Sequence, residues 1–236
     1  MIDRLAENHI DLTRMPVEVA PIAHYHMGGV KADASMAADV PGLYVAGEVV
    51  GGANGANRLS GNAITEALVF GRSAGRSAAE RTRRVAQPNI KPRDAAATLD
   101  LIRADTKVQP QKNTAAMVAH LQAAMADHVG PFRTGAKLST ALDEIAGLAA
   151  GLGEHPSGHA AAFDLQRLEW FDLRNMLTVA HAVTATALAR TESRGAHQRE
   201  DFQTMLPQWQ VHQRVQLNGG ELKISGAPAA AKALAS

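Results

Sequence analysis

The stretch from His24 to Arg72 decides the fold, and it reads HYHMGGVKADASMAADVPGLYVAGEVVGGANGANRLSGNAITEALVFGR. It contains a Gly-Gly turn, an apolar run that ends in Ala46-Gly47-Glu48, and a glycine-rich loop that carries Asn57-Arg58. Glycine lets the backbone approach a flat ligand without obstruction by a side chain. A helix predicted from about Ser60 follows this loop, and the first N–H groups of a helix have no partner within it. We therefore expect a ligand site of this chain to lie in this stretch.

Short apolar runs alternate with polar turns within this stretch. Residues 31–40 are largely polar and predict a hairpin-like loop, whereas Leu43 to Ala46 form an apolar and aromatic run that predicts a buried strand. Glu48 would then follow the carboxyl end of that strand, where ligands of open α/β sheets tend to bind. Ile64 and Leu68 mark one apolar face of the helix that follows.

Composition excludes several classes of protein. The formal net charge is +1 and acidic and basic residues are mixed, so no strong field attracts nucleic acid or anionic lipid. The one basic run, Arg81 to Arg84, ends a predicted helix and there balances the helix dipole. Cysteine is absent, which excludes disulfides, cysteine nucleophiles and thiolate-bound metal clusters within this chain. The chain has no apolar run of about twenty residues that could span a membrane.

The remainder of the chain has a largely helical pattern. Residues 86–94 are rich in proline and polar residues and predict a linker. Beyond it, apolar residues recur at three- and four-residue spacing, which predicts a three-helix bundle. The predicted helices span residues 113–128, 137–152 and 163–190. Trp209 to Val215 and Leu222 to Ile224 predict two strands around the turn at Asn218-Gly219-Gly220.

The two ends of the chain carry weaker signals. Met1 to Asn8 predict one or two helical turns, and Val17 to Ile22 predict an extended approach to the Gly-Gly turn. The last residues, GAPAAAKALAS, are small and predict a disordered tail.

The motifs AHYHMGG, VPGLYVAGE and GANRLSGNAITEALVFGR resemble the flavoprotein subunit of succinate dehydrogenase and fumarate reductase, a family that also includes L-aspartate oxidase. Three later motifs, VGPFRT, EWFDLRNML and ESRGAHQREDF, resemble the helical C-terminal domain of those enzymes. The resemblance covers roughly residues 15 to 215, and its motifs are long and occur in the same order.

The resemblance implies an α+β fold: the end segment of an FAD-binding α/β domain, a three-helix-bundle C-terminal domain and a short β hairpin. Residues 1–85 would be the C-terminal segment of the FAD-binding domain with a remnant of the capping domain. Residues 86–205 would be the helical domain, and residues 206–236 the hairpin and a flexible tail. The family's GxGxxG loop, which holds the FAD pyrophosphate on backbone N–H groups, does not occur in this chain. We therefore expect a C-terminal part of a flavoprotein.

Arg58 and His24 are the expected substrate-binding residues. A planar guanidinium binds a carboxylate through two parallel hydrogen bonds, which suits a dicarboxylate. The resemblance implies that Arg58 holds a substrate carboxylate and that His24 hydrogen-bonds a carboxylate or carbonyl. The structural alternatives are a salt bridge for Arg58 and a hydrogen-bonded core histidine for His24.

The expected cofactor-binding residues are Glu48, Asn62, Ala63 and Ile64. The resemblance implies that Glu48 accepts hydrogen bonds from the ribityl hydroxyls of FAD, whereas its structural alternative is a capping glutamate. The N–H groups of Asn62, Ala63 and Ile64, at the positive end of a helix, would stabilise negative charge at the flavin N1–C2=O edge. An ordinary helix start, capped by Ser60 or Asn62, is compatible with that role.

Two further places depart from simple expectation. Asn54 stands where the respiratory enzymes usually carry histidine before Gly-Ala-Asn-Arg. This difference makes the general class, a flavin oxidoreductase, a safer expectation than succinate or fumarate as the substrate.

His197, Arg199 and Glu200 predict a buried polar clasp between domains rather than catalytic groups. We assign no catalytic residue and no metal ligand within this chain, because the family's proton-donating arginine would lie in the absent half.

The resemblance implies the C-terminal portion of an FAD-dependent oxidoreductase acting on the CH–CH group of a dicarboxylate of the succinate/fumarate type. Activity and FAD binding would need the N-terminal flavoprotein half, and an iron–sulfur subunit is a further implied partner. We expect no nucleic acid partner, no membrane insertion, and a cytoplasmic place peripheral to the inner face of the cell membrane. A catalytically inactive helical interaction module, or a truncated product that docks an iron–sulfur partner, is the alternative. A piece of an L-aspartate oxidase is disfavoured by Met27, where that group commonly has cysteine.

Overall fold

The computed structural model of the chain describes residues 2–19, 23–86, 91–104, 112–156, 162–228. They form two compact units, Met1–Val85 and Ala86–Ser236. Part of the predicted extended stretch, most of the predicted linker and residues 229–236 of the predicted disordered tail lie outside the described residues. For residues 226–228 the prediction of disorder is wrong, because they pair with residues 211–213 in a β hairpin.

The first unit contains a short helix α1 (Ile2–Ala6), a 3-10 turn η1 (Gly47–Val49) and the long helix α2 (Asn62–Arg84). The predicted hairpin-like loop is present, because Ala32 and Ala38 form an antiparallel bridge. Its turn is held by the Asp33 carboxylate, which accepts hydrogen bonds from the backbone N–H groups of Ser35 and Ala37.

The prediction of a buried strand from Leu43 to Ala46 is wrong. Tyr44 forms an isolated bridge with Ala37, and Leu43 is exposed. An apolar run becomes a strand only when neighbouring strands accept its backbone hydrogen bonds. Here the polar hairpin-like loop is the neighbour, and it offers one bridge rather than a ladder. Glu48 accordingly sits on the turn η1 and not at the end of a strand.

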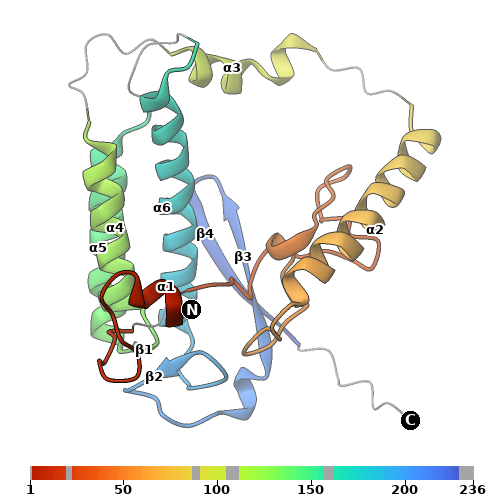
Figure 1. The fold of residues 1–236 in the computed structure, drawn as a ribbon. Coiled ribbons are helices and arrows are strands. Elements are labelled where there is room, and N and C mark those ends of the chain that lie inside the picture. Colours follow the sequence, from red (N-terminus) through yellow and green to blue (C-terminus); the bar gives the residue numbers. More distant parts are fainter. Residues whose placement is uncertain (1, 20–22, 87–90, 105–111, 157–161, 229–236) are drawn as a thin grey trace, which may run out of the picture. The chain divides into compact units, whose positions relative to one another are not determined.

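The second unit is dominated by three helices that pack against one another: α4 (Thr114–Val129), α5 (Gly135–Leu152) and α6 (Leu165–Ala189). They run side by side as the predicted three-helix bundle (Figure 1). The helix α3 (Ala96–Arg103) and the 3-10 turn η2 (Pro92–Asp94) precede them and were not predicted. Each bundle helix begins at a side-chain cap, which satisfies one of its free N–H groups. The caps are Asn113, Thr134 and Asp164.

The bundle encloses the main apolar core of the unit. Trp170 and Leu173 on α6 are almost completely buried, and they pack with Leu121 from α4 and Ile145 from α5. The Trp170 indole N–H donates to the carbonyl of Leu152 at 3.2 Å, so its one polar atom is satisfied inside the core. Burial of these large side chains stabilises the bundle by about 2 kcal/mol each.

The predicted β hairpin follows the bundle. Strands β3 (Val211–Asn218) and β4 (Glu221–Pro228) pair antiparallel, with Asn218 opposite Glu221. The turn residues Gly219 and Gly220 both have positive φ, as a two-residue hairpin turn requires. The first strand begins later than predicted, because Pro207–Trp209 form the 3-10 turn η3.

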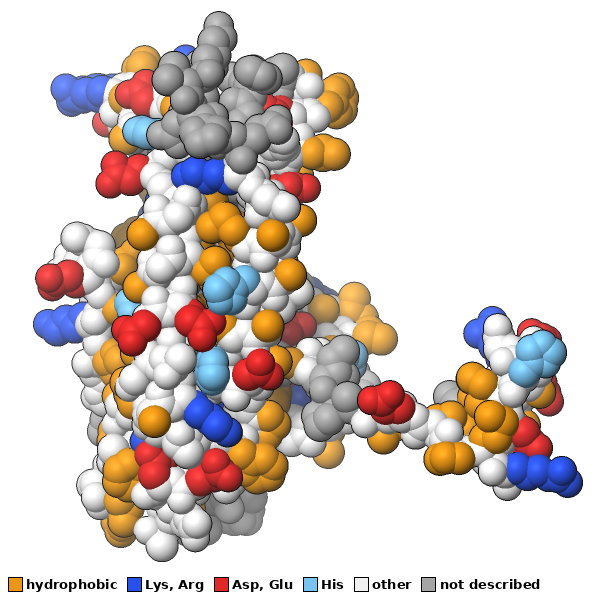
Figure 2. Space-filling model, turned by 90° about the vertical axis from the view of Figure 1, so that its left-hand side faces the viewer, with side chains coloured by type: hydrophobic (Ala, Val, Ile, Leu, Met, Phe, Trp, Pro, Cys, Tyr) orange, Lys and Arg blue, Asp and Glu red, His pale blue; other side chains and the backbone are white. Residues whose placement is uncertain are grey.

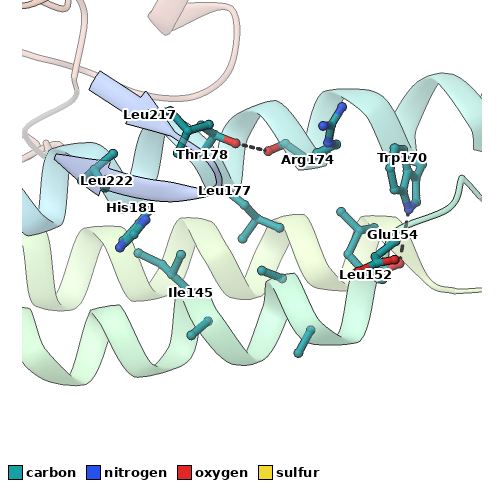
Figure 3. Close-up of a pocket in the computed structure, with 15 residues that line it drawn as sticks. Ile145, Leu152, Glu154, Trp170, Arg174, Leu177, Thr178, His181, Leu217 and Leu222 are labelled. Carbon is teal, nitrogen blue, oxygen red and sulfur yellow. Dashed lines mark hydrogen bonds between the residues drawn. The ribbon is translucent and has the colours of Figure 1, made fainter. Parts of the chain in front are cut away.

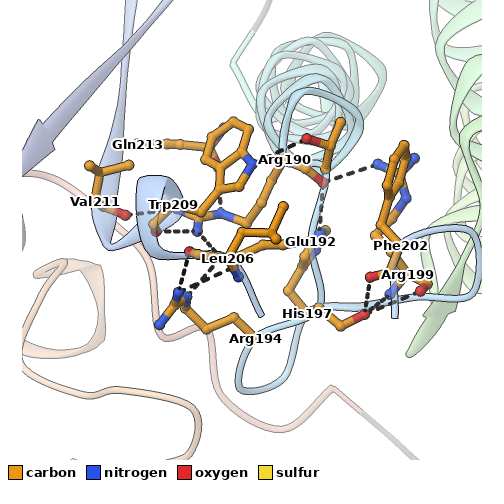
Figure 4. Close-up of polar contacts among 12 residues, drawn as sticks. Arg190, Glu192, Arg194, His197, Arg199, Phe202, Leu206, Trp209, Val211 and Gln213 are labelled. Atoms are coloured by element: carbon orange, nitrogen blue, oxygen red, sulfur yellow. Dashed lines mark hydrogen bonds and ion pairs between the residues drawn. The ribbon is translucent and has the colours of Figure 1, made fainter. Parts of the chain in front are cut away.

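A buried carboxylate organises the loop between α6 and the hairpin. The Glu192 side chain is fully buried, and its two oxygens accept hydrogen bonds from Arg190, Arg194 and the backbone N–H of Leu206. Arg190 also donates to the carbonyls of Trp209 and Val211 (Figure 4). The acid is thus paired with two guanidinium groups that in turn hold the chain leading into β3.

Arg199 and His197 form a polar clasp, but it lies within the second unit and not between domains as predicted, and Glu200 takes no part in it. Arg199 is buried, donates to the carbonyls at the C-terminal end of α6, and pairs with both oxygens of Asp201. It belongs to the short strand β2 (Gln198–Arg199), which pairs in parallel with β1 (Phe132–Arg133). His197 contacts the Arg133 guanidinium at 2.8 Å. These contacts join parts of the second unit, and the Glu200 side chain is exposed.

The outer face of the bundle, seen from the side of α4 and α5, carries scattered acidic, basic and histidine side chains among small apolar ones (Figure 2). Glu144 of α5 contacts the imidazoles of His120 and His128 of α4, at 2.9 and 3.3 Å. In the described part of the chain, no helix is long and apolar enough to cross a membrane.

Replacing Glu192 by glutamine tests the buried charge. The change leaves Arg190 and Arg194 without their shared carboxylate, so we expect the free energy of unfolding to fall by about 3 kcal/mol. Urea denaturation measures this change. Glu200→Gln in the same loop is the matched control and should leave stability unchanged, since its side chain is exposed. Equal stability of the two variants would contradict the pairing.

The same carboxylate predicts acid sensitivity. Burial raises the pKa of Glu192, but hydrogen bonds from Arg194, Leu206 and Arg190 outweigh burial and lower the pKa from its ordinary value of 4.5 to about 2. A carboxyl whose pKa is lower in the folded protein stabilises the fold when ionised. Its contribution should therefore be complete above pH 4.5 and be lost as the pH falls towards about 2. Thermal unfolding at several pH values should show this dependence, and Glu192→Gln should reduce it.

Candidate functional site

Two backbone segments of the first unit meet at Gly29 and Gly51. The N–H of Val30 donates to the carbonyl of Val49 at 2.7 Å, and the N–H of Gly51 donates back to the carbonyl of Val30 at 3.0 Å. A Cβ atom on Gly29 would lie 2.2 Å from the Val49 carbonyl oxygen, and one on Gly51 would lie 2.8 Å from the Gly29 oxygen. Both positions therefore require glycine, and their contact places the Gly-Gly turn beside the glycine-rich loop.

Glu48 joins the same two segments from the turn η1. Its carboxylate Oε1 accepts a hydrogen bond from the backbone N–H of His26 at 2.8 Å. Glu48 is exposed, so its second oxygen is open to a further donor. A carboxylate fixed in this way can receive hydroxyl hydrogen bonds from a bound ligand.

Arg58 lies against Tyr25, the residue that follows His24. Its guanidinium carbon is 4.5 Å from the centroid of the Tyr25 ring, and its Nη1 donates to the carbonyl of Leu59 at 2.8 Å. Within the described residues, Arg58 Nε has no hydrogen-bond partner and Arg58 forms no ion pair. The exposed His24 imidazole makes no hydrogen bond there either. The unpaired Nε of Arg58 is buried, so the Nη2 edge of the guanidinium and the exposed His24 imidazole are the groups open to a ligand. The structural alternative of an Arg58 salt bridge is not realised in this part of the chain.

Tyr25 and Glu66 take part in the site, although the sequence did not single them out. The Tyr25 hydroxyl donates to Glu66 Oε2 at 2.5 Å, and the Asn54 amide lies 3.1 and 3.3 Å from the two Glu66 oxygens. The position of Glu66, one turn into a predicted helix directly after the glycine-rich loop, was the signal that could have pointed to it.

The beginning of α2 differs from the beginnings of the bundle helices. Its N-cap position is Gly61, with φ of 87°, and no side chain caps the helix there. Neither Ser60 nor Asn62 is the cap, which corrects that expectation. The Asn62 N–H donates to the Leu59 carbonyl at 3.2 Å, whereas the N–H groups of Ala63 and Ile64 have no partner among the described residues. Open donors at a positive helix end suit a partly negative carbonyl edge, such as that of an isoalloxazine ring.

A cavity lies elsewhere in the chain, in the second unit. Its volume is about 770 Å³, and it is lined by α5, α6 and the tip of the hairpin. In Figure 3, Leu177 and Ile145 lie at its apolar wall, with Arg174 and His181 at its edge. All of its lining residues belong to the second unit, so it shares none with the site around Arg58.

Comparison with known families explains both units. Residues 2–64 match the family model of the FAD binding domain, and residues 118–234 match that of the fumarate reductase flavoprotein C-terminal region. The chain belongs to the succinate dehydrogenase and fumarate reductase flavoprotein family. Members of this family are oxidoreductases, and the FAD binding domain points to FAD as the cofactor.

Individual relatives agree with this assignment. The fumarate reductase flavoprotein subunit of Mycobacterium tuberculosis is 38% identical over 207 residues, which is 82% of this chain and 35% of that protein. L-aspartate oxidase of Rhodospirillum rubrum is 40% identical over 199 residues, which is 82% of this chain and 61% of that protein. The chain thus spans less than two thirds of these curated relatives.

The fold is also that of the family. The Mycobacterium smegmatis Sdh1 complex in the apo form superposes with a TM-score of 0.84 at 34% identity, covering 96% of this chain and 40% of that chain. The predicted α+β fold, with the end of an FAD-binding domain, a helical bundle and a hairpin, is therefore confirmed.

Replacing Gly29 by alanine tests the contact on which the site is built. The added Cβ would overlap the Val49 carbonyl, so we expect a loss of about 2 kcal/mol and separation of the two segments. Hydrogen exchange of the Val30 and Gly51 amides should become fast. Gly55→Ala, in the same glycine-rich loop, is the matched control, because nothing lies within 4 Å of its added Cβ. Unchanged protection in Gly29→Ala would contradict the contact.

Proposed function

We propose that this chain supplies the substrate-binding side and part of the flavin-binding side of an FAD-dependent oxidoreductase that acts on the CH–CH group of a dicarboxylate of the succinate/fumarate type. The observation that carries the proposal is the pairing of Arg58 with the segment of His24. Arg58 stacks on Tyr25, the residue that follows His24, and neither the Arg58 Nε nor the His24 imidazole has a hydrogen-bond partner among the described residues.

Arg58 and His24 would bind the carboxylates of the substrate. The Arg58 guanidinium can hold one carboxylate through two hydrogen bonds, because it is not neutralised by an acid in the described part of the chain. The His24 imidazole can donate to the second carboxylate. When negative charge builds on the substrate as its C–H bond breaks or forms, these fixed donors stabilise that charge without reorganisation. They also hold the reacting carbons in one orientation.

The flavin-facing residues fit FAD on two observations. The N-terminus of α2 offers the N–H groups of Ala63 and Ile64, whereas the Asn62 N–H donates to the Leu59 carbonyl at 3.2 Å. Glu48 presents a fixed carboxylate whose second oxygen has no hydrogen-bond partner among the described residues. The helix end would stabilise negative charge at the N1–C2=O edge, and Glu48 would accept from ribityl hydroxyls. FAD, when bound, supplies hydride chemistry that amino-acid side chains do not provide.

Other parts of the site would come from a segment outside this chain. The chain has no GxGxxG loop to hold a pyrophosphate, so an N-terminal flavoprotein half would supply it, together with the proton-donating arginine. The apolar face of α2 supports such a partner, because Ile64 and Leu68 are 71% and 69% exposed. An iron–sulfur subunit would take up or deliver electrons, and the assembly would lie in the cytoplasm at the inner face of the cell membrane.

The alternative, an inactive helical interaction module, is separated from this proposal by flavin binding. The chain should be purified together with the N-terminal half of its flavoprotein. Stoichiometric flavin absorbance and turnover of fumarate or succinate support the proposal. An assembly that forms but binds no flavin would favour the inactive module.

Arg58→Lys tests the substrate role in that assembly. Lysine keeps the charge but cannot form the bidentate contact, so kcat/KM for fumarate should fall about a hundredfold, equivalent to about 3 kcal/mol. Flavin content should not change. Arg76→Lys, at an exposed position on α2, is the matched control and should retain full activity. Unchanged kcat/KM in Arg58→Lys would rule out Arg58 as the carboxylate ligand.

A further inference from the structure

Glu66 connects three segments of the first unit through one carboxylate. Glu66 lies on helix α2 and accepts a hydrogen bond at 2.5 Å from the hydroxyl of Tyr25, which is 41 residues away in sequence. It also accepts the Asn54 amide of the glycine-rich loop, 12 residues away. The helix, the loop and the segment that carries His24 therefore share a single acceptor.

Tyr25 lies between this acid and the arginine of the site. Its hydroxyl contacts Glu66, and the face of its ring carries the Arg58 guanidinium. Glu66 and Arg58 form no ion pair with each other in the described residues. Glu66 is thus linked to Arg58 through the Tyr25 ring rather than by a direct ion pair. A direct pair would occupy the edge of the guanidinium that a substrate carboxylate needs.

The chemistry of the link favours a fixed orientation of Arg58. A phenol that donates to a carboxylate becomes more electron-rich, and a cation above its ring is then attracted more strongly. The hydrogen bond to Glu66 and, to a smaller extent, burial raise the pKa of Tyr25. The hydroxyl therefore remains protonated and continues to donate. Asn54 holds the glycine-rich loop to the same carboxylate with an amide, which does not titrate.

We propose that Glu66 is a positioning residue, which acts through Tyr25 to hold the Arg58 guanidinium flat and leave its edge free for a substrate carboxylate. This inference rests on the proposed function of the same site. It assigns to Glu66 an effect on substrate affinity, with no direct contact to the substrate.

The kinetic test uses the flavoprotein assembly with fumarate as substrate. Glu66→Ala and Tyr25→Phe should each raise KM about tenfold, the loss of one charge-assisted hydrogen bond, while kcat changes little. The double variant should be no worse than either single variant, because both remove the same link. Glu66→Gln keeps an acceptor for Tyr25 and should lie between wild type and Glu66→Ala. Glu80→Ala makes the same chemical change at an exposed position of α2 and should leave KM unchanged.

A second readout requires no turnover. The chain has two tyrosines, so Tyr44→Phe leaves Tyr25 as the one phenol that titrates. In that background, the tyrosinate absorbance of Tyr25 should appear at lower pH once Glu66 is replaced by glutamine. Glu80→Gln should not shift the titration. An unchanged titration in Glu66→Gln would show that Glu66 does not act on the Tyr25 hydroxyl, which would overturn the proposal.

The outcomes separate this proposal from the one on which it rests. A wild-type assembly that binds flavin but turns over neither succinate nor fumarate would overturn the proposed function before any variant is compared. An active wild type in which the KM of Glu66→Ala equals that of Glu80→Ala would overturn the positioning role alone. Additive effects of Glu66→Ala and Tyr25→Phe would also overturn it, because the two residues would then act independently.

Discussion

The first unit depends on a contact between two stretches of backbone with no side chain between them. Gly29 and Gly51 approach so closely that a methyl group on either would overlap the other segment. This contact makes the Gly-Gly turn and the glycine-rich loop neighbours, and it brings Glu48, Tyr25 and Arg58 within reach of one another. The site is therefore a consequence of absent side chains, and its polar groups are arranged around that contact.

The second unit is held by an apolar core and by several buried or capping polar groups that have hydrogen-bond partners. The bundle helices begin at side-chain caps, Arg199 closes the C-terminal end of α6, and Glu192 is surrounded by donors. Pairing of this kind is expected of a scaffold, in which an unpaired buried group costs stability. It is not complete, because buried atoms of His128, Asp164 and Arg167 have no hydrogen-bond partner among the described residues. In the first unit, Arg58 and the start of α2 also keep donors without a partner among the described residues, and these are the groups to which the proposed function assigns ligands.

The sequence predicted the long elements well and the site contacts less well. Helical periodicity is local, so the bundle helices and the start of α2 could be placed to within a few residues. The strand at Leu43 to Ala46 could not be judged in this way, because a strand depends on neighbours that the run itself does not contain. The contact between Tyr25 and Glu66 joins distant residues without any periodic signal. Motif resemblance therefore indicated His24 and Arg58 but not the carboxylate behind them.

The left-handed turn at Gly61 protects the open start of α2 against a common route of stabilisation. A serine, aspartate or asparagine caps a helix from an extended backbone conformation, whereas Gly61 has φ of 87°. Substitution there would strain the turn before it could satisfy the free N–H groups. A capping side chain in the usual extended conformation therefore cannot be introduced at Gly61 without moving the backbone, and this backbone geometry keeps the helix end uncapped.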